Sequence, residues 1–298
     1  MLAPIVIFIY DRLDVLVKTV DALKKNTLAS ESDLFVYSDG AKNQTDNENI
    51  KIIRDYIRTL DGFKTITLIE REKNFGLSAS IIDGVTEIVN RYGKVIVLED
   101  DLLTHPHFLT FMNDGLNAYE NDPSVASIHG HVYPMKGLPK TFFLKGADCW
   151  GWATWKRGWE NFELDGKKLL NALESRNLTY QFDFNHSYPY TKMLQDQIAG
   201  KNNSWAIRWY ASAFLHDMLT LYPGKSFVRH IGYQGGTHFQ WHGKFDPANG
   251  TLNKESYSFQ KITVAPSAEA FRQFTFFFKK RKFIKLLRIM NIFLWMKQ

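Results

Sequence analysis

The sequence predicts an α/β protein with a largely parallel sheet flanked by helices. Short apolar runs alternate with amphipathic stretches through the first half of the chain. One of these runs ends abruptly in three consecutive acids, Glu99, Asp100 and Asp101, as expected for a buried strand that leads into a site. With 45% apolar and 23% charged residues, the chain of 298 residues can build a substantial core.

Each expected element follows from its own residue pattern. An apolar run predicts a first strand at 4–9, and apolar residues at helical spacing predict a helix at 13–25. The same patterns then predict a strand at 34–40 that ends in an Asp-Gly turn, a helix at 50–60, a strand at 65–71, a helix at 78–91, a strand at 95–98 and a helix at 106–119. Ligands of open α/β sheets bind at the carboxyl ends of the strands, so we expect the polar residues after these strands to meet.

The composition changes after about residue 135, where Trp, Tyr, Gly and His become frequent, as in 149–155 and 205–210. Aromatic faces with polar edges suit sugar rings, although the same residues can equally form a core. The chain shows no internal repeat and no glycine-serine linker, so we expect both halves to form one compact unit.

The last residues carry much of the excess of positive over negative charge. Among residues 271–298 there are cations and no acids, and the net charge of the whole chain is +6. The cations are Arg272, Lys279, Lys280, Arg281, Lys282, Lys285, Arg288 and Lys297. Aromatic and aliphatic residues lie between them, a mixture that suits the headgroup region of an anionic membrane, and the longest uncharged run is too short to span one. The alternative is a terminal helix that packs on its own domain.

Cysteine content and the start of the chain bear on location. The single Cys149 allows no internal disulfide, and the first residues lack the basic region of a signal peptide. We therefore expect a cytoplasmic protein, peripheral on the inner face of the membrane through its tail. Nucleic acid is not an expected partner because the rest of the chain shows no basic stripe.

The acid triplet indicates a metal site. Adjacent carboxylates repel one another unless a cation joins them, and a divalent metal bound there would hold the phosphates of a substrate. The alternative is that these acids favour the amino end of the helix that follows.

Five motifs in order carry a resemblance to a known family. They lie at 4–12, 36–40, 98–102 with 106–109, 122–124 and 235–238. Together they resemble a nucleotide-sugar glycosyltransferase of the GT-A fold, similar to the N-acetylglucosaminyltransferase I-like family and to bacterial surface-polysaccharide glycosyltransferases. The resemblance implies a Rossmann-like, mostly parallel sheet flanked by helices, and composition adds an aromatic-rich acceptor-side half and a C-terminal basic amphipathic helix. We therefore expect a single domain at 1–265, with a nucleotide-sugar half at 1–125 and an acceptor half at 126–265, followed by a basic tail at 266–298.

The resemblance also implies a donor site. Arg12 would pair with the diphosphate, Asp39 would accept hydrogen bonds from uridine, and Glu99 and Asp100 would face the donor sugar or ribose. The full set of residues expected to bind the nucleotide sugar is Tyr10, Arg12, Asp39, Asn74, Gly76, Ser78, Glu99, Asp100 and Trp205.

The metal ion implied by the resemblance is Mn²⁺ or Mg²⁺. Its expected ligands are Asp101, the last acid of the triplet, and His238.

The catalytic base is less clear from the sequence. In relatives it is an acid just before a Trp, but the corresponding stretch 202–205 contains no carboxylate, and Asn203 is a poor proton acceptor. Asp196 is the nearest substitute, followed by Asp217 and Asp148, and Asp148 can alternatively bind the acceptor.

The expected function is therefore an inverting, metal-dependent transfer of a sugar from a UDP-sugar to a glycan or lipid-linked glycan. One alternative is a catalytically silent glycan-binding or scaffolding protein, because Asn203 replaces the acid. A sugar nucleotidyltransferase is less favoured, because residues 10–14 lack the glycine-rich loop that such enzymes need.

Overall fold

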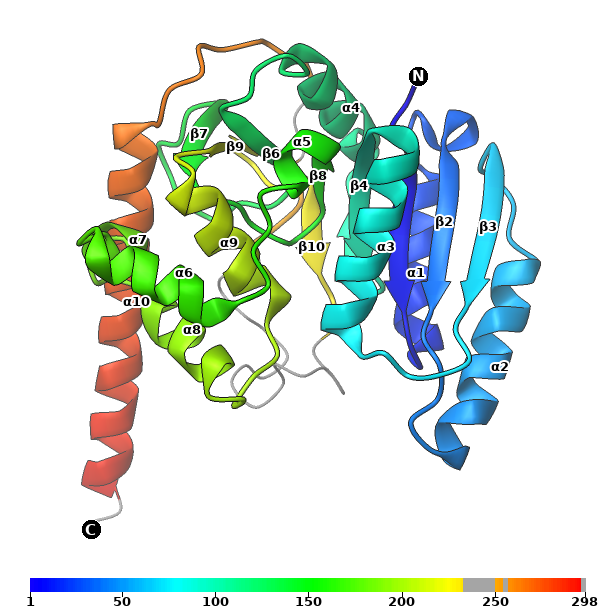
Figure 1. Ribbon diagram of the computed structural model, residues 1–298, viewed down its shortest axis with the longest axis horizontal. Helices are drawn as coiled ribbons and strands as arrows, with labels where there is room; N and C mark the ends of the chain where they lie inside the picture. The colour runs from blue at the N-terminus through cyan, green and yellow to red at the C-terminus, as the bar shows by residue number, and fades with distance from the viewer. Residues whose placement is uncertain (233–249, 254–256, 296–298) are drawn as a thin grey trace.

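Eight strands form one sheet within the described residues, in the order β3-β2-β1-β4-β8-β6-β9-β7 (Figure 1). The computed structural model describes residues 1–232, 250–253 and 257–295, with side chains up to residue 284. One half of the sheet is entirely parallel and contains β3 (Thr65–Glu70), β2 (Asp33–Ser38), β1 (Ile5–Ile9) and β4 (Lys94–Glu99). The other half contains β8 (Trp152–Trp155), β6 (Val125–His129), β9 (Leu219–Pro223) and β7 (Thr141–Lys145), and there only β6 and β9 pair in parallel. The mostly parallel α/β sheet is therefore confirmed.

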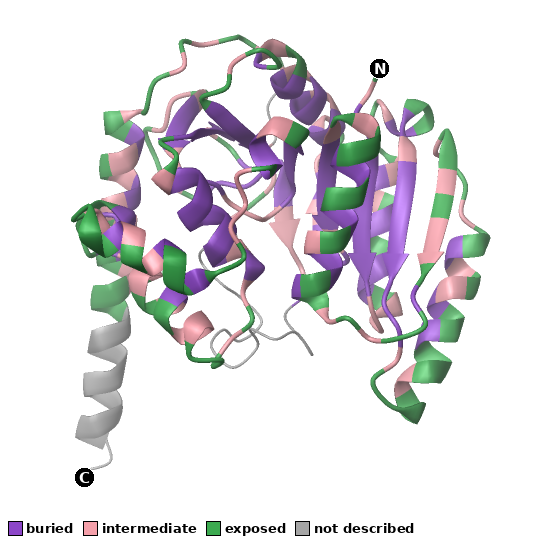
Figure 2. Cartoon of the chain, viewed as in Figure 1, coloured by how far each residue is buried: buried purple, intermediate pink, exposed green. Residues whose placement is uncertain are grey.

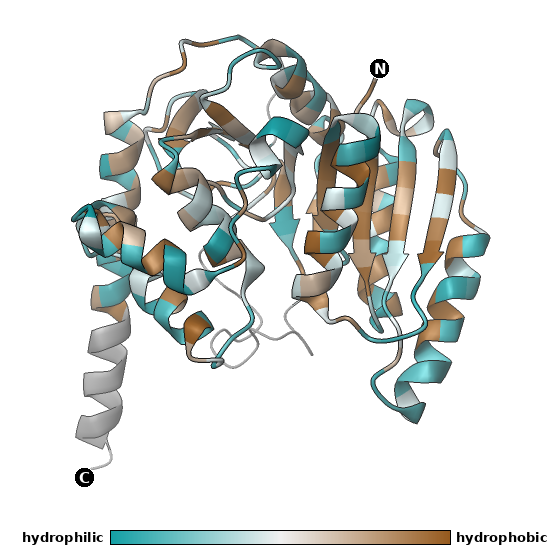
Figure 3. Cartoon of the chain, viewed as in Figure 1, coloured by the Kyte–Doolittle hydropathy of each residue, from teal (hydrophilic) through white to brown (hydrophobic). Residues whose placement is uncertain are grey.

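Helices cover both faces of the parallel half, which explains its continuous apolar strands. Ile5 and Ile7 belong to one core cluster, whereas Val6 and Phe8 belong to the cluster on the opposite face. The first face of the parallel half is covered by α1 (Leu13–Lys24) and α2 (Gln44–Arg58), and α4 (Phe108–Ala118) packs over β6 and β8 on the same side. The second face is covered by α3 (Leu77–Tyr92), while α5 (Lys156–Trp159) packs over β6 and β8 and α9 (Trp205–Leu215) packs against α3. Figure 2 shows β1 and β2 buried along their length, and Figure 3 shows that these strands are hydrophobic.

Two boundaries differ from the sequence-based expectation. Helix α2 begins at Gln44 rather than at 50, because the Asn43 side chain caps it by accepting a hydrogen bond from the Asp46 N–H at 3.0 Å. Helix α4 begins at Phe108, after an unexpected short strand, β5 (Leu102–Thr104). Strand β5 pairs with β10 (Val228–His230) in an antiparallel ribbon, so a segment far along the chain returns to the end of β4.

A third core lies beyond β7 and β9 and includes the C-terminal helix. It is enclosed by α6 (Gly166–Ser175), α7 (Thr179–Phe182), α8 (Tyr190–Ile198) and the start of α10 (Ala268–Trp295). Helix α10 contributes Ala270, Phe274 and Phe278, which are spaced four residues apart and therefore share one face. None of the described helices combines the length and the apolar character needed to cross a membrane.

We expect Phe274→Ala to lower the free energy of unfolding by about 3–5 kcal/mol, because it removes a buried ring and leaves a cavity. Urea denaturation followed by circular dichroism measures this loss. Phe276→Ala, two residues away at a position that is 67% exposed, is the matched control and should change stability by no more than about 0.5 kcal/mol. Equal losses for both variants would contradict the packing of α10 described above.

Candidate functional site

The carboxyl ends of β1, β2 and β4 lie next to one another at one edge of the sheet. The chain steps from β1 to β2 and β3 and then places β4 on the other side of β1, which creates a topological switch point. Arg12 follows β1, Asp39 follows β2, and the acid triplet lies at the end of β4. Arrowheads of β2 and β3 mark this edge in Figure 1. Ligands of α/β proteins bind at such a point, so the structure brings these predicted site residues together where a site is expected.

Arg12 holds the acid cluster together. Its Nη2 donates hydrogen bonds to Asp100 Oδ1 and, at 2.9 Å, to Asp101 Oδ2. Its Nη1 is buried and has no hydrogen-bond partner within the described part of the chain. A buried guanidinium nitrogen without a partner is costly, and an anionic oxygen of a ligand would satisfy it.

The three acids differ in their tendency to ionise. Burial, together with the charges of Asp101 and Asp100, raises the pKa of Glu99 to about 8. Burial and the charge of Asp101 raise the pKa of Asp100 to about 7, although Arg12 acts in the opposite direction. Burial also disfavours ionised Asp101, but His230 and Arg12 more than offset it, so the pKa of Asp101 is lowered. The cluster is therefore short of positive charge, as expected for a site that receives a cation.

Asp101 has a histidine neighbour that the sequence did not reveal. His230, the last residue of β10, places its Nε2 3.2 Å from Asp101 Oδ2. Its ring stacks on Trp150 at 5.2 Å between centroids. Only the pairing of β10 with β5 brings His230 to the acids, and no local pattern signals that pairing.

The residues present fit a divalent metal in part. Carboxylate oxygen and imidazole nitrogen are donors that suit Mn²⁺, and carboxylate oxygen suits Mg²⁺. Asp101 and His230 would hold such an ion, with its other positions filled by water and ligand oxygens. Across the described residues, no three His, Cys, Asp or Glu side chains are grouped to hold a metal by themselves. The predicted ligand His238 lies outside the described residues.

The backbone after β10 closes over the acids. The Ile231 N–H donates to the Asp101 carbonyl oxygen at 2.8 Å. A Cβ atom at Gly232 would lie 2.1 Å from Asp101 Oδ2 and 2.7 Å from Arg12 Nη1. Any larger residue would push the Asp101 and Arg12 side chains aside, so Gly232 is a second residue of this site that the sequence did not reveal.

Asp39 organises the neighbouring loop. Its Oδ1 accepts hydrogen bonds from the N–H groups of Gly40 and Phe75, and its Oδ2 accepts one from Gly76 N–H at 2.8 Å. Asn74 Nδ2 donates to the Gly40 carbonyl oxygen at 2.7 Å. The predicted residues Asp39, Asn74 and Gly76 thus form one hydrogen-bonded turn at the sheet edge.

Tyr10 and Ser78 lie on either side of this turn and have protein partners. Tyr10 donates its hydroxyl to Asp46, and burial together with that hydrogen bond raises the pKa of Tyr10 to about 12. Ser78 accepts a hydrogen bond from Arg208 Nη2 at 2.9 Å, which ties α3 to α9.

Trp205 packs within the core. Only 4% of it is exposed, and its ring stacks on Trp152 at 5.5 Å. The ring fills the space between α9 and the sheet together with Trp159 and Trp209, and binding of the nucleotide sugar by Trp205 stays a prediction. Trp150, stacked on His230, is the tryptophan next to the acid cluster.

Asp148 lies among aromatic and histidine side chains. Its Oδ2 is 3.5 Å from both His129 Nε2 and the Tyr222 hydroxyl, and burial raises the pKa of Asp148. His131, whose ring contacts Trp150 at 4.7 Å, acts electrostatically on Asp148. Aromatic contacts from Trp150 through His131 therefore connect Asp148 with His230 and the acid cluster.

The other two acids suggested as bases lie in different surroundings. Asp196 in α8 pairs with Lys192 at 2.5 Å and with Lys201 at 3.6 Å, and these cations lower the pKa of Asp196. Asp217 pairs with Lys145 and precedes β9, which places it at the amino edge of the sheet, away from the acid cluster. A carboxylate with a lowered pKa is a weak proton acceptor.

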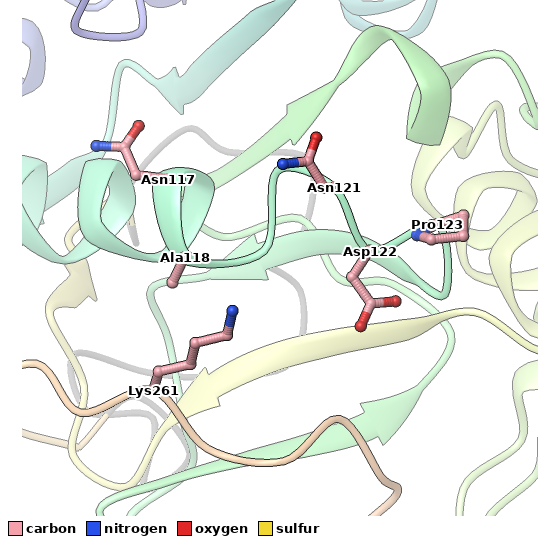
Figure 4. Close-up of a pocket in the computed structure, with 6 residues that line it drawn as sticks. All are labelled: Asn117, Ala118, Asn121, Asp122, Pro123 and Lys261. Atoms are coloured by element: carbon pink, nitrogen blue, oxygen red, sulfur yellow. The ribbon is translucent and has the colours of Figure 1, made fainter.

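Two surface hollows lie outside this cluster. One, of about 420 Å³, is lined by Asn117, Ala118, Asn121, Asp122, Pro123 and Lys261 (Figure 4). It precedes β6 and so lies at the amino edge of the sheet. The second, of about 600 Å³, lies between α1 and the β5–β10 ribbon and includes Lys18, Asp21, Lys25 and Arg229. Neither contains a member of the acid cluster.

The model of the family described as Glycosyl transferase family 2 matches residues 5–171, a stretch that includes β1 to β4 and the acid triplet. A comparison with curated proteins found no match.

Solved structures give weaker similarities. Mannosyltransferase PcManGT from Pyrobaculum calidifontis, in complex with GDP-Man and Mn²⁺, is 14% identical with a TM-score of 0.31, over 44% of this chain and 36% of that chain. S. aureus TarS 1–349 is 11% identical with a TM-score of 0.40, over 76% and 60%. The same TarS fragment in complex with UDP-GlcNAc is 16% identical with a TM-score of 0.31, over 47% and 37%. The chain thus spans between 36% and 60% of the length of these structures.

We expect Gly232→Ala to abolish the stabilisation of the protein against heat by Mn²⁺, because the new methyl group displaces the Asp101 carboxylate. Thermal unfolding with and without Mn²⁺ measures this. Gly200→Ala is the control: its φ of +71° makes alanine strained there as well, but no atom lies within 4 Å of the added Cβ. An Mn²⁺-dependent rise in Tm that persists in Gly232→Ala would refute the role given to this position.

Proposed function

The chain belongs to glycosyl transferase family 2, and we propose that it is an inverting, metal-dependent glycosyltransferase. It moves a sugar from a UDP-sugar, or another nucleoside diphosphate sugar, to a hydroxyl of a glycan or lipid-linked glycan in surface polysaccharide synthesis. The observation that carries this proposal is the Arg12 guanidinium, which bonds Asp100 and Asp101 while its buried Nη1 lacks a partner among described residues. A diphosphate oxygen is a suitable partner for that nitrogen.

In this proposal the donor lies along the carboxyl edge of the sheet. Arg12 and the turn held by Asp39 bind the diphosphate and the nucleoside, and the choice of uridine rests on the resemblance of the motifs. Asp101 and His230 hold Mn²⁺ or Mg²⁺, which supplies charge stabilisation for the departing diphosphate. Arg12 adds a fixed positive charge beside the same oxygens, and Gly232 keeps the backbone close enough to exclude water.

We propose Asp148 as the base that accepts the proton of the acceptor hydroxyl. In an inverting transfer the hydroxyl oxygen attacks the anomeric carbon as the bond to the diphosphate breaks, and the hydroxyl proton goes to the base. Burial raises the pKa of Asp148, whereas the cations around Asp196 lower the pKa of that carboxylate. Asp148 is also connected to the acid cluster through His131 and Trp150.

A catalytically silent, glycan-binding protein of the same fold is the second candidate. It is favoured by a single observation, namely that Asn203, just before α9, stands where relatives carry an acid. A sugar nucleotidyltransferase is third, because the turn from Tyr10 to Asp14 has no glycine to cradle a triphosphate.

We further propose a domain organisation and a location for the protein. Residues 1–265 act as one catalytic unit, with the donor side at 1–125 and the acceptor side at 126–265, and the continuous sheet supports this unity. The tail at 266–298 binds an anionic membrane, so that the protein works in the cytoplasm as a peripheral protein of the inner face.

Asp101→Asn should weaken binding of UDP in the presence of Mn²⁺ at least about tenfold, since the amide loses the charge that holds the cation. Isothermal titration calorimetry measures this, with thermal melting to verify folding. Asp61→Asn, at a side chain that is 83% exposed, is the control and should bind as wild type does. Undiminished binding by Asp101→Asn would refute the metal role, and UDP binding without release of UDP from any of a panel of UDP-sugars would favour the silent protein.

Asp148→Asn should lower kcat for hydrolysis of the UDP-sugar that wild type hydrolyses by about 10²–10⁴-fold and leave its KM nearly unchanged, because the base is lost and the donor site is intact. A coupled assay of released UDP measures both constants. Asp196→Asn should retain wild-type kcat. If Asp196→Asn loses activity instead, or if Asn203→Asp raises kcat while Asp148→Asn does not lower it, Asp148 is not the base.

A further inference from the structure

Helix α10 has an inward face that belongs to the surroundings of Asp148. Phe274 is 3% exposed and contacts Tyr222, the residue whose hydroxyl donates to Asp148, at 6.0 Å between ring centroids. Phe278 is 2% exposed and contacts Tyr133 and Tyr188 at 5.3 and 4.7 Å. Removal of α10 would therefore expose the aromatic wall behind Asp148.

The opposite face of α10 mixes phenylalanine with cations and faces solvent. Phe276 and Phe283 are 67% and 60% exposed, and their separation of seven residues places them on one face of the helix. Lys279 and Lys280 lie between them and are also exposed. Among the described residues, neither lysine forms an ion pair with an acid. We call Phe276, Lys279, Lys280 and Phe283 the outward stripe.

The chemistry of the outward stripe matches an anionic bilayer. Two exposed phenylalanine rings on a helix are unfavourable in water but suit the boundary between headgroups and acyl chains. The two lysines beside them, which form no ion pair with a described acid, gain attraction from anionic lipid. The helix runs from Ala268 to Trp295, and no described helix is suited to spanning a membrane.

We propose that α10 links binding of a lipid bilayer to the acceptor side of the site, an inference that rests on the proposed function. Its outward stripe binds an anionic lipid bilayer, while its inward face forms the wall behind Asp148, so that the acceptor side of the site is held next to a bilayer that carries a lipid-linked acceptor. Figure 1 shows α10 along the flank of the molecule beside α6, α7 and α8, and its C-terminal end lies on the side to which β2 and β3 point. That side is the edge at which Arg12 and the acid cluster lie.

Co-sedimentation of the full chain with vesicles tests the lipid part of this inference. Wild type should bind vesicles of phosphatidylcholine that contain about 30% phosphatidylserine. It should bind vesicles of pure phosphatidylcholine at least about tenfold more weakly. Phe276→Ser with Phe283→Ser, and separately Lys279→Glu with Lys280→Glu, should each lower binding at least about tenfold. Lys51→Glu with Lys167→Glu is the charge-matched control on two other helices, at exposed lysines, and should bind as wild type does.

Activity on a soluble donor separates this inference from the proposed enzyme function. The outward variants should hydrolyse the UDP-sugar at the wild-type rate. Phe274→Ala with Phe278→Ala, assayed at a temperature at which circular dichroism shows it to be folded, should lower the rate, because only the inward face supports Asp148. Loss of hydrolysis in the outward variants, or an unchanged rate in the inward variant, would overturn the coupling.

Three further outcomes would overturn lipid binding by the stripe. They are equal binding to neutral and anionic vesicles, unchanged binding by both outward variants, and a lipid-free dimer that the outward variants convert to monomer. The last result would assign the stripe to self-association. If no nucleoside diphosphate sugar is hydrolysed by wild type but anionic vesicles bind through the stripe, the lipid inference stands and the proposed function fails.

Discussion

The interaction between one guanidinium and three neighbouring carboxylates is the constraint on which the rest of the site depends. Arg12 cannot neutralise Glu99, Asp100 and Asp101 by itself, and burial makes the shortage of positive charge more costly, which is why the pKa values of Glu99 and Asp100 rise. Such a cluster is unfavourable for an isolated fold and is tolerated because the surrounding elements hold it: β1 and β4 pair directly, and the backbone at Gly232 covers Asp101. A divalent cation would relieve the shortage of positive charge, and an anion would supply the missing partner of Arg12 Nη1. The same edge of the sheet can therefore accept both the metal ion and the diphosphate of a metal–diphosphate complex.

Much of this edge was predictable from the sequence, because local physical rules determine it. A strand buried on both faces must be apolar along its length, so β1 and β4 are recognisable, and the polar residues that follow them must reach the carboxyl edge. His230, Gly232 and Trp150 were not predictable in the same way. His230 and Gly232 reach Asp101 through the pairing of β10 with β5, which joins segments more than a hundred residues apart, and Trp150 stacks on His230 in turn. No helical or strand period encodes such a pairing. The start of α2 was missed for a simpler reason, since its first turns are polar and only the Asn43 cap marks them.

The aromatic second half shows where composition misleads. Tryptophan suits both sugar stacking and core packing, and burial decides between them, not residue type. Trp205 is one of four tryptophans that pack together between the sheet and its helices, whereas Trp150 contacts His230 at the edge. The acids of this half follow the same logic. Asp196 was the nearest acid to Asn203 along the chain, but distance along the chain does not report on charge environment, and two lysines stabilise its ionised form. Asp148 is surrounded by rings that disfavour ionisation, which makes it the better proton acceptor of the two.

In the proposed arrangement, the C-terminal helix would meet two requirements that a single amphipathic face could not. A helix that used its only apolar face to bind lipid would be attached to the rest of the protein by its connection alone, and its orientation would not be transmitted to the site. Helix α10 instead places Phe274 and Phe278 against the aromatic core and carries a separate pair of phenylalanines, Phe276 and Phe283, on the opposite side. Phe274 and Phe278 are four residues apart on the inner face, and Phe276 and Phe283 are seven residues apart on the outer face. Both spacings return to the same side of an α-helix, so one continuous helix can carry both pairs. Because the inner contacts include Tyr222, which donates to Asp148, packed rings connect the outer face of α10 with the acceptor side of the proposed site.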